Sequence, residues 1–154
     1  MNAMTTRALL VGLLVALWAW VSVLARLNVE VWVGLVALGC FFAAGGGVSG
    51  LQRTFLSALS GVIWVLLADA VRVAVGGSVI VRALILGLMV CVIVLQSRVT
   101  LLSFTAGALA GAGVALGLRV NTVTEAIRVA VALAIGAVLG FVAERVTEAI
   151  GSRR

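Results

Sequence analysis

The sequence predicts an all-α fold, a polytopic transmembrane helix bundle of about six spans. Hydrophobic residues make up 64% of the 154 residues and charged residues only 10%, whereas a soluble domain carries about a quarter charged residues. The mean hydropathy is +1.34. The apolar residues form long continuous runs, without the alternation of barrel strands. Because so few polar side chains cannot cover a water-facing surface, we expect a lipid bilayer to cover it.

The basic residues are all arginines, and the formal net charge is +6. Most of them stand singly at the ends of apolar runs, as Arg26, Arg53 and Arg98 do. Nucleic-acid-binding proteins instead cluster their cations on one face, with aromatic side chains between them. Single arginines that flank apolar helices extend to lipid headgroups. We therefore expect an interfacial role for these charges and no nucleic-acid partner.

Six apolar runs approach the roughly 20 residues that a helix needs to cross about 30 Å of hydrocarbon. We expect the first run, after Arg7, to be a retained span rather than a removed signal peptide. The predicted spans are residues 8–25, 31–51, 54–71, 79–95, 99–118 and 126–143. Five spans are the alternative, because Gly45, Gly46 and Gly47 can break a helix and Arg82 lies inside the fourth run.

The last helix has readable ends. Thr122 and Glu125 have the spacing of a capping box, in which each side chain accepts a hydrogen bond from a free backbone N–H group. We expect the helix to leave the bilayer as a solvated end, residues 144–154, and to stop at Gly151. The whole chain, residues 1–154, then forms one transmembrane domain. With six spans, the side that holds both termini has one arginine more than the other, which favours cytoplasmic termini.

Small residues gather in the run 99–118. Gly107 and Gly111 are four residues apart, as are Gly113 and Gly117. This spacing favours close helix packing, within one protomer or between protomers of a homo-oligomer. The alternative is a permeation path lined by exposed backbone carbonyls, and the glycines of 45–47 suit such irregular backbone better.

Ionisable residues inside spans are costly, so they pair or serve function. Asp69 is the main candidate. Arg72 follows at a helical spacing that allows an interfacial ion pair. Alternatively, Asp69 couples to a substrate or a proton, with Arg82 as its partner. Trp64 lies near the middle of its run, where its indole N–H needs an acceptor.

Serine and threonine hydroxyls in the third and fifth runs can line a polar path or bond their own backbone carbonyls. With the residues above they form a candidate substrate path. Its members are Asp69, Gly45, Gly46, Gly47, Ser60, Trp64, Ser103, Phe104 and Gly107.

The chain offers little for catalysis or metal binding. It contains no histidine, and Cys40 and Cys91 lie in apolar runs without a second ligand at metal-binding spacing. An intramembrane enzyme needs paired acids or a nucleophile with a base, and the acids here are scattered. We expect no catalytic residue, no metal site and no cofactor.

Two weak internal matches suggest two halves of three spans each, which would be oppositely oriented. One match pairs Phe42-Ala43-Ala44-Gly45 with Phe104-Thr105-Ala106-Gly107. In the other, Gly61 precedes Asp69 by the interval at which Gly136 precedes Glu144. The matches have different offsets, and chance similarity between glycine- and alanine-rich segments is the alternative.

The order of short motifs resembles the YcdZ-like family of small bacterial inner-membrane proteins, a family of unknown function. The motifs are Trp18-Ala19-Trp20-Val21, Gly39-Cys40, Phe42-Ala43, Gly50-Leu51, Leu59-Ser60-Gly61-Val62-Ile63-Trp64 and Leu101-Leu102-Ser103-Phe104 with Gly107 and Gly111. The resemblance implies a multi-pass protein of the bacterial inner membrane and leaves the activity open. From the residues we expect a channel or transporter for a small solute or ion; the alternative is an accessory or interaction subunit that transports nothing.

Overall fold

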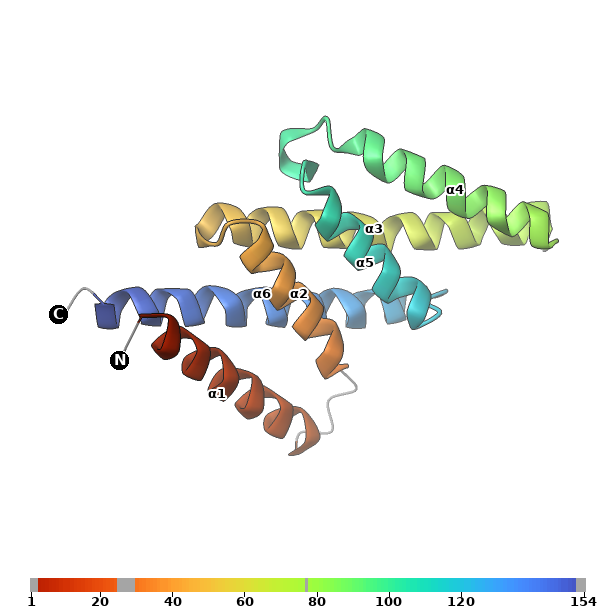
Figure 1. Cartoon of the computed structure of the whole chain (residues 1–154). Coiled ribbons are helices and arrows are strands. Elements are labelled where there is room, and N and C mark those ends of the chain that lie inside the picture. The colour runs from red at the N-terminus through yellow and green to blue at the C-terminus, as the bar shows by residue number, and fades with distance from the viewer. Residues whose placement is uncertain (1–2, 25–29, 77, 152–154) are drawn as a thin grey trace.

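The computed structural model describes residues 3–24, 30–76 and 78–151 (Figure 1). Regular structure within these ranges is helical throughout, which confirms the all-α prediction. The elements are α1 (Ala3–Leu24), α2 (Val31–Ala43), α3 (Gly47–Val75), α4 (Val79–Gln96), the 3-10 turn η1 (Thr100–Leu102), α5 (Thr105–Gly117) and α6 (Val123–Gly151). By length and composition, α3, α4 and α6 can each cross a membrane, whereas α2, α5 and the apolar part of α1 are shorter.

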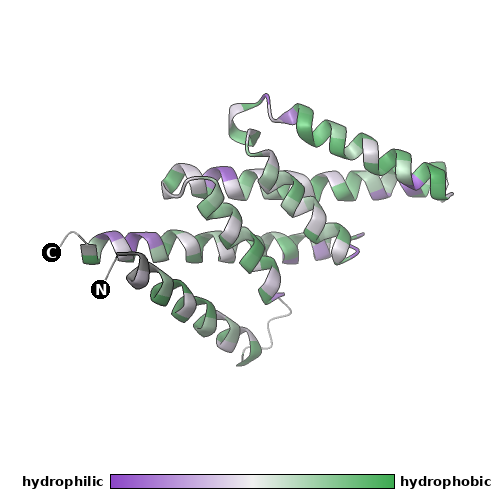
Figure 2. Cartoon of the chain, viewed as in Figure 1, coloured by the Kyte–Doolittle hydropathy of each residue, from purple (hydrophilic) through white to green (hydrophobic). Residues whose placement is uncertain are grey.

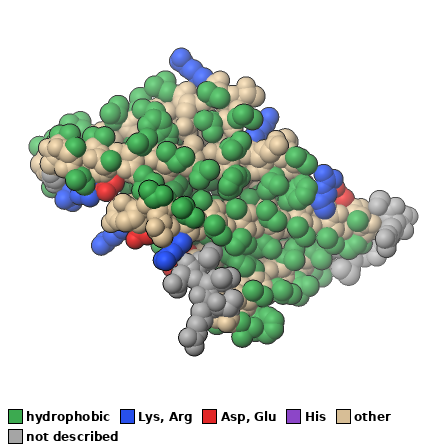
Figure 3. Space-filling model, turned by 180° about the vertical axis from the view of Figure 1, so that it is seen from behind, with side chains coloured by type: hydrophobic (Ala, Val, Ile, Leu, Met, Phe, Trp, Pro, Cys, Tyr) green, Lys and Arg blue, Asp and Glu red, His purple; other side chains and the backbone are tan. Residues whose placement is uncertain are grey.

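The hydrophilic residues lie in two roughly parallel bands (Figure 2). One band passes from the end of α4 past the start of α3 to the end of α6. The other passes from the start of α2 past the start of α6 to the end of α3 and the start of α4. The helices α1 to α6 cross the mostly apolar layer between these bands. Hydrophobic side chains also cover most of the face seen in Figure 3, with charged groups near its margins.

The bands explain why the helices differ in length. The helices α3 and α6 have 29 residues each, about 43 Å, and lie obliquely to the bands (Figure 2). The helices α2 and α5 have 13 residues each, about 20 Å, and stand more nearly upright in the layer. Because the hydrocarbon is about 30 Å thick, each of these two helices needs the adjoining turn to complete a crossing.

The second and fifth helices are therefore shorter than the predicted spans 31–51 and 99–118. After α2, Gly45, Gly46 and Gly47 all have positive φ, at 93°, 71° and 65°. Only glycine adopts this conformation without a steric penalty, so the chain turns there and the residues from Gly47 onward belong to α3. In the fifth run, η1 and a short turn precede α5, which begins at Thr105.

The last helix begins as the capping box predicts. The Glu125 carboxylate accepts a hydrogen bond from the Thr122 backbone N–H at 3.3 Å, and the Thr122 hydroxyl accepts one from the Glu125 backbone N–H at 3.3 Å. These bonds satisfy N–H groups that have no partner inside the helix. From this start α6 runs without a break to Gly151.

The two halves of the chain repeat the same arrangement. The helix α2 packs chiefly on α6, and α5 packs chiefly on α3; likewise α1 lies against α6 and α4 against α3. In Figure 1 the corresponding helices run in opposite directions, α3 against α6 and α2 against α5. This is an inverted repeat of α1–α3 and α4–α6, an arrangement found in many transporters.

Only one of the two sequence matches follows this repeat. Gly61 in α3 and Gly136 in α6 occupy corresponding places, each against the short helix of the opposite half. The match between Phe42 and Phe104 is wrong, because Phe42 lies in the last turn of α2 whereas Phe104 precedes α5. The Phe42 and Phe104 segments look similar because both are rich in small residues, but they do not occupy equivalent places in the two halves.

Glycines let the short helices touch the long helices backbone to backbone. A Cβ atom on Gly61 would overlap the Ala108 carbonyl of α5, and one on Gly111 would overlap the Ala58 carbonyl of α3. Gly136 of α6 meets the Gly34 carbonyl of α2 in the same way. Such close approach maximises dispersion contacts where the hydrophobic effect does not drive helix association.

Gly113 and Gly117 differ from Gly107 and Gly111. Among the described residues, no atom beyond the glycine's own stretch of α5 lies within 4 Å of the position that a Cβ would take on either of them. Gly107 and Gly111 thus pack within the protomer, and the other pair takes no part in that packing.

Gly111→Ala and Gly113→Ala form a matched pair on one helix. We expect Gly111→Ala to destabilise the fold by about 1–3 kcal/mol, because the added methyl group would push α5 away from α3. Gly113→Ala should be neutral or stabilising by about 0.5–1 kcal/mol, since alanine favours the helix and has free space there. Unfolding by sodium dodecyl sulfate, followed by circular dichroism, would measure both. Equal effects of the two substitutions would contradict the backbone contact.

Candidate functional site

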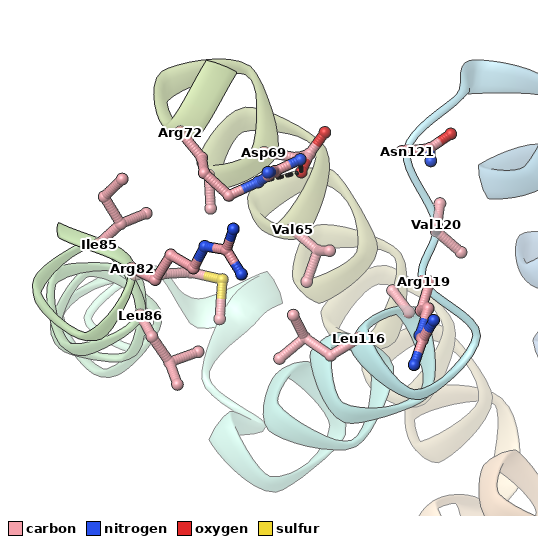
Figure 4. Close-up of a pocket in the computed structure, with 13 residues that line it drawn as sticks. Val65, Asp69, Arg72, Arg82, Ile85, Leu86, Leu116, Arg119, Val120 and Asn121 are labelled. Atoms are coloured by element: carbon pink, nitrogen blue, oxygen red, sulfur yellow. Dashed lines mark hydrogen bonds and ion pairs between the residues drawn. The ribbon is translucent and has the colours of Figure 1, made fainter. Parts of the chain in front are cut away.

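A cleft of about 480 Å³ opens at the polar border where α3 ends and α4 begins (Figure 4). Its walls come from α3, α4, the end of α5 and the turn into α6. The lining residues are Val65, Ala68, Asp69, Arg72, Arg82, Ile85, Leu86, Met89, Ala115, Leu116, Arg119, Val120 and Asn121. The floor is apolar and the charged groups stand around it. This combination is typical of small-molecule sites.

Asp69 and Arg72 form an ion pair on α3. The Asp69 Oδ1 atom lies 2.6 Å from Arg72 Nη2 and accepts a hydrogen bond from Arg72 Nε at 2.8 Å. The structure thus contains the ion pair that the helical spacing allows, and Arg72 rather than Arg82 is the partner of Asp69. Within the described residues, the guanidinium groups of Arg82 and Arg119 have no hydrogen-bond or ion-pair partner.

Arg119 belongs to a turn that repeats the turn after α2. At the end of α5, the Val120 N–H donates to the Ala115 carbonyl and the Arg119 N–H to the Leu116 carbonyl. At the end of α2, Gly46 and Gly45 make the same two bonds to Phe41 and Phe42. Both patterns are Schellman motifs, which place one residue in the left-handed region.

The residue in that position differs between the halves. It is Gly45 after α2, with φ of 93°, and Arg119 after α5, with φ of 55°. A residue with a side chain is disfavoured there by about 1 kcal/mol or more relative to glycine. The second half therefore has an arginine at the cleft at a cost in backbone conformation.

At the other end of α3, a carboxylate from α6 binds the turn between α2 and α3; we call this the closed end. Glu144 of α6 accepts a hydrogen bond from the Gly47 N–H at the start of α3, with an Oε2 to N distance of 2.6 Å, and its carboxylate lies against Gly46. A carboxylate at a helix N-terminus is stabilised by the free N–H groups and the helix dipole. Asp69 is the counterpart of Glu144 in the other half, but it binds Arg72, and a cleft separates it from the turn.

A chain of hydrogen bonds joins α3 to the last residue of α4. Trp64 donates from Nε1 to Gln96 Oε1 at 2.8 Å, and Gln96 donates from Nε2 to Ser60 Oγ at 2.9 Å. The Ser60 hydroxyl donates to the Ser57 carbonyl at 2.7 Å. The predicted need of Trp64 for an acceptor is confirmed. Sequence reasoning assigned Gln96 to a link; the signal it missed was a polar amide one residue beyond an apolar run.

Two hydroxyls on the buried face of α3 have no hydrogen-bond partner within the described residues. Thr54 and Ser57 are both 0% exposed, and the Thr54 Oγ1 and Ser57 Oγ atoms are unsatisfied. Ser57 lies beside Gly107, which the Phe104 ring also covers. A buried hydroxyl without a hydrogen-bond partner costs about 1–3 kcal/mol. These two hydroxyls are therefore unsatisfied polar groups inside the bundle, on the part of α3 between the turn bound by Glu144 and the cleft.

The structure does not bring the predicted path residues together in one cavity. Asp69 lines the cleft, and the glycines 45–47 form the turn at the other end. Ser60 and Trp64 bond Gln96 between α3 and α4, whereas Ser103 is exposed and donates to the Thr100 carbonyl at 2.9 Å. Phe104 and Gly107 pack at the start of α5. The cleft also contains Arg119, for which the sequence suggested only an interfacial role, and Arg82, which was considered as a partner of Asp69.

The oblique long helices, the upright short helices and the charged cleft define a polytopic α-helical membrane protein built as an inverted repeat. Residues 8–148 match the family described as "Protein of unknown function (DUF1097)". The chain belongs to this family. No solved structure matches it.

Curated relatives agree with this assignment. The chain is 30% identical over 113 residues to the inner membrane protein YcdZ of Escherichia coli (strain K12), which covers 73% of this chain and 68% of the relative. It is 29% identical over 113 residues to the inner membrane protein YcdZ of Salmonella typhimurium (strain LT2), and this match covers 73% of this chain and 69% of the relative. The uncharacterized protein YahC of Escherichia coli is 37% identical over 73 residues, 44% of each chain. The resemblance to the YcdZ-like family is confirmed, and with it an inner-membrane protein of an uncharacterised family.

The bond between Trp64 and Gln96 can be measured by a double-mutant cycle. We expect Gln96→Leu and Trp64→Phe to be coupled by about 0.5–1.5 kcal/mol, because either substitution removes the same hydrogen bond. Trp20→Phe is the matched control, since Trp20 is exposed on α1, and it should add to Gln96→Leu without coupling. Additive effects for the Trp64 pair would show that this bond contributes nothing to stability.

Proposed function

We propose that the protein transports a small solute or ion across the inner membrane by opening its two ends alternately. The observation that carries the proposal is the unequal state of two equivalent ends in an inverted repeat. Glu144 holds the turn before α3 at one end, whereas at the other end Asp69 is paired with Arg72 and a cleft remains. In inverted-repeat transporters, alternating access is an exchange of the two halves between such states.

The centre of the bundle provides the barrier that this mechanism requires. Gly61 meets the Ala108 carbonyl and Gly111 meets the Ala58 carbonyl, so no solute passes between α3 and α5 in this state. The unsatisfied hydroxyls of Thr54 and Ser57 lie on the same face of α3, on the side of the closed end. They would receive a polar solute when Glu144 releases the turn.

The arrangement in the membrane follows from the same features. The first helix begins and the last helix ends at one end of the bundle (Figure 1), which agrees with termini on one side. We place that side in the cytoplasm, because it has the larger number of arginines. Self-association is part of the proposal, since large apolar side chains such as Val79, 83% exposed, leave α4 free for lipid or a second protomer.

Releasing the closed end tests the mechanism. In a background without Cys40 and Cys91, spin labels at Val48→Cys and Val146→Cys would report the closed end, and labels at Ile80→Cys and Val123→Cys would report the cleft. All four positions are exposed. We expect Glu144→Gln to lengthen the first distance and shorten the second, shifting the equilibrium about tenfold or more through loss of a charged hydrogen bond.

The control is Glu148→Gln, which removes an exposed partner of Arg145 at the same end and should leave both distances unchanged. Double electron–electron resonance measures the distances. Unchanged distances in Glu144→Gln, or changes in the same direction at both ends, would contradict alternate opening.

Transport itself is tested by stopped-flow light scattering of proteoliposomes challenged with glycerol, acetate or inorganic phosphate. We expect the protein to accelerate entry of at least one of these solutes, and Glu144→Gln to alter that rate severalfold while Glu148→Gln does not. Absence of accelerated entry for all three, in protein that keeps its helical circular dichroism, would reject the proposal. A partner that then co-purifies in stoichiometric amount would identify an accessory subunit.

A further inference from the structure

We propose that the cleft between α3, α4 and the α5–α6 turn binds a phosphate group, carried either by a lipid or by a soluble ligand. The proposal stands on the cleft alone and does not require transport. The cleft contains three arginines and one carboxylate among its lining residues. Because Asp69 is already satisfied by Arg72, the guanidinium groups of Arg82 and Arg119 remain available to an anion.

The position of Arg119 indicates that its side chain serves a purpose at this turn. The equivalent turn in the first half uses Gly45 in the left-handed position, and glycine would relieve the strain at position 119 as well. A strained non-glycine residue at a pocket is an observation from which function is inferred. With arginine at position 119, a second positive charge lies at the cleft, on the side away from Arg82 (Figure 4).

The chemistry of the cleft selects the ligand class. Guanidinium groups bind phosphate oxygens by paired N–H donors, which makes arginine the preferred residue for phosphate recognition. Much of the remaining wall is apolar and includes Ile85, Leu86 and Met89 from α4. A volume of about 480 Å³ is within the range of pockets for small organic ligands, about 300–1,000 Å³.

A ligand with this chemistry has two sources. The cleft lies at the polar border of the apolar layer (Figure 2), where phospholipid headgroups reside, and it also faces the aqueous phase from which a soluble phosphate ester would enter. Both sources present the same phosphate to Arg82 and Arg119. They differ in whether the apolar chain is necessary for binding.

Binding to the purified full chain in a neutral detergent separates these sources. The probes are dihexanoylphosphatidylglycerol, inorganic phosphate and dihexanoylglycerol, which has the same chains without the phosphate. We expect the phosphatidylglycerol probe to bind and dihexanoylglycerol to bind at least tenfold more weakly. Binding of inorganic phosphate at comparable affinity would assign a soluble phosphate ligand, and its failure to bind would assign the lipid. Equal binding of the two chain-bearing probes would overturn the proposal.

Variants connect the binding to the cleft. Arg82→Gln and Arg119→Gly should each weaken binding of the phosphatidylglycerol probe about tenfold, since each removes a charged hydrogen-bond donor. Arg98→Gln is the control, because Arg98 is exposed outside the cleft, and it should leave the affinity unchanged.

Arg119→Gly also separates binding from folding. Because glycine relieves the left-handed strain, this variant should keep or raise the thermal midpoint, by about 2–4 °C, while it loses the ligand. Full affinity in Arg119→Gly, or an equal loss in Arg98→Gln, would show that the anion is held by general surface charge and would overturn the proposal.

Discussion

Direct contact between the backbones of short and long helices determines the form of this molecule. Where Gly61 meets Ala108 and Gly136 meets Gly34, no side chain separates the two helix axes. In a bilayer, apolar side chains gain little by leaving lipid, so helix association depends on this fit. The contact attaches each short helix to the long helix of the other half and thereby makes one bundle of two repeats. It also positions the turns after α2 and α5, and with them the closed end and the cleft.

The sequence predicted the class of fold well because composition alone decides it. Polar groups too few to face water require lipid, and the capping box at Thr122 located the start of the last helix because its chemistry is local. The lengths of α2 and α5 were not predictable in this way. A hydropathy pattern gives the length of the apolar segment between two charged residues. It does not distinguish an upright short helix with a turn from one continuous span.

Less of the candidate site than of the fold could be predicted from the sequence, for a related reason. The Asp69–Arg72 pair is visible as a helical spacing, and the structure contains it. That Arg82 and Arg119 line the same cleft depends on how α4 and α5 lie against α3, which no local pattern encodes. The strain at Arg119 became evident only by comparison with Gly45 in the other half. Gln96 was recognisable as a link between α3 and α4 only from its hydrogen bonds to Trp64 and Ser60, because an amide at a helix end has no single expected partner.

The oblique course of α3 and α6 has a mechanical consequence. A tilted helix accommodates a change in bilayer thickness by changing its inclination, whereas the upright α2 and α5 have little inclination to change. Stretching or thickening the membrane would therefore rotate the long helices against the short ones. That shear acts on the two Schellman turns, and it makes the width of the cleft a function of hydrophobic mismatch with the surrounding lipid.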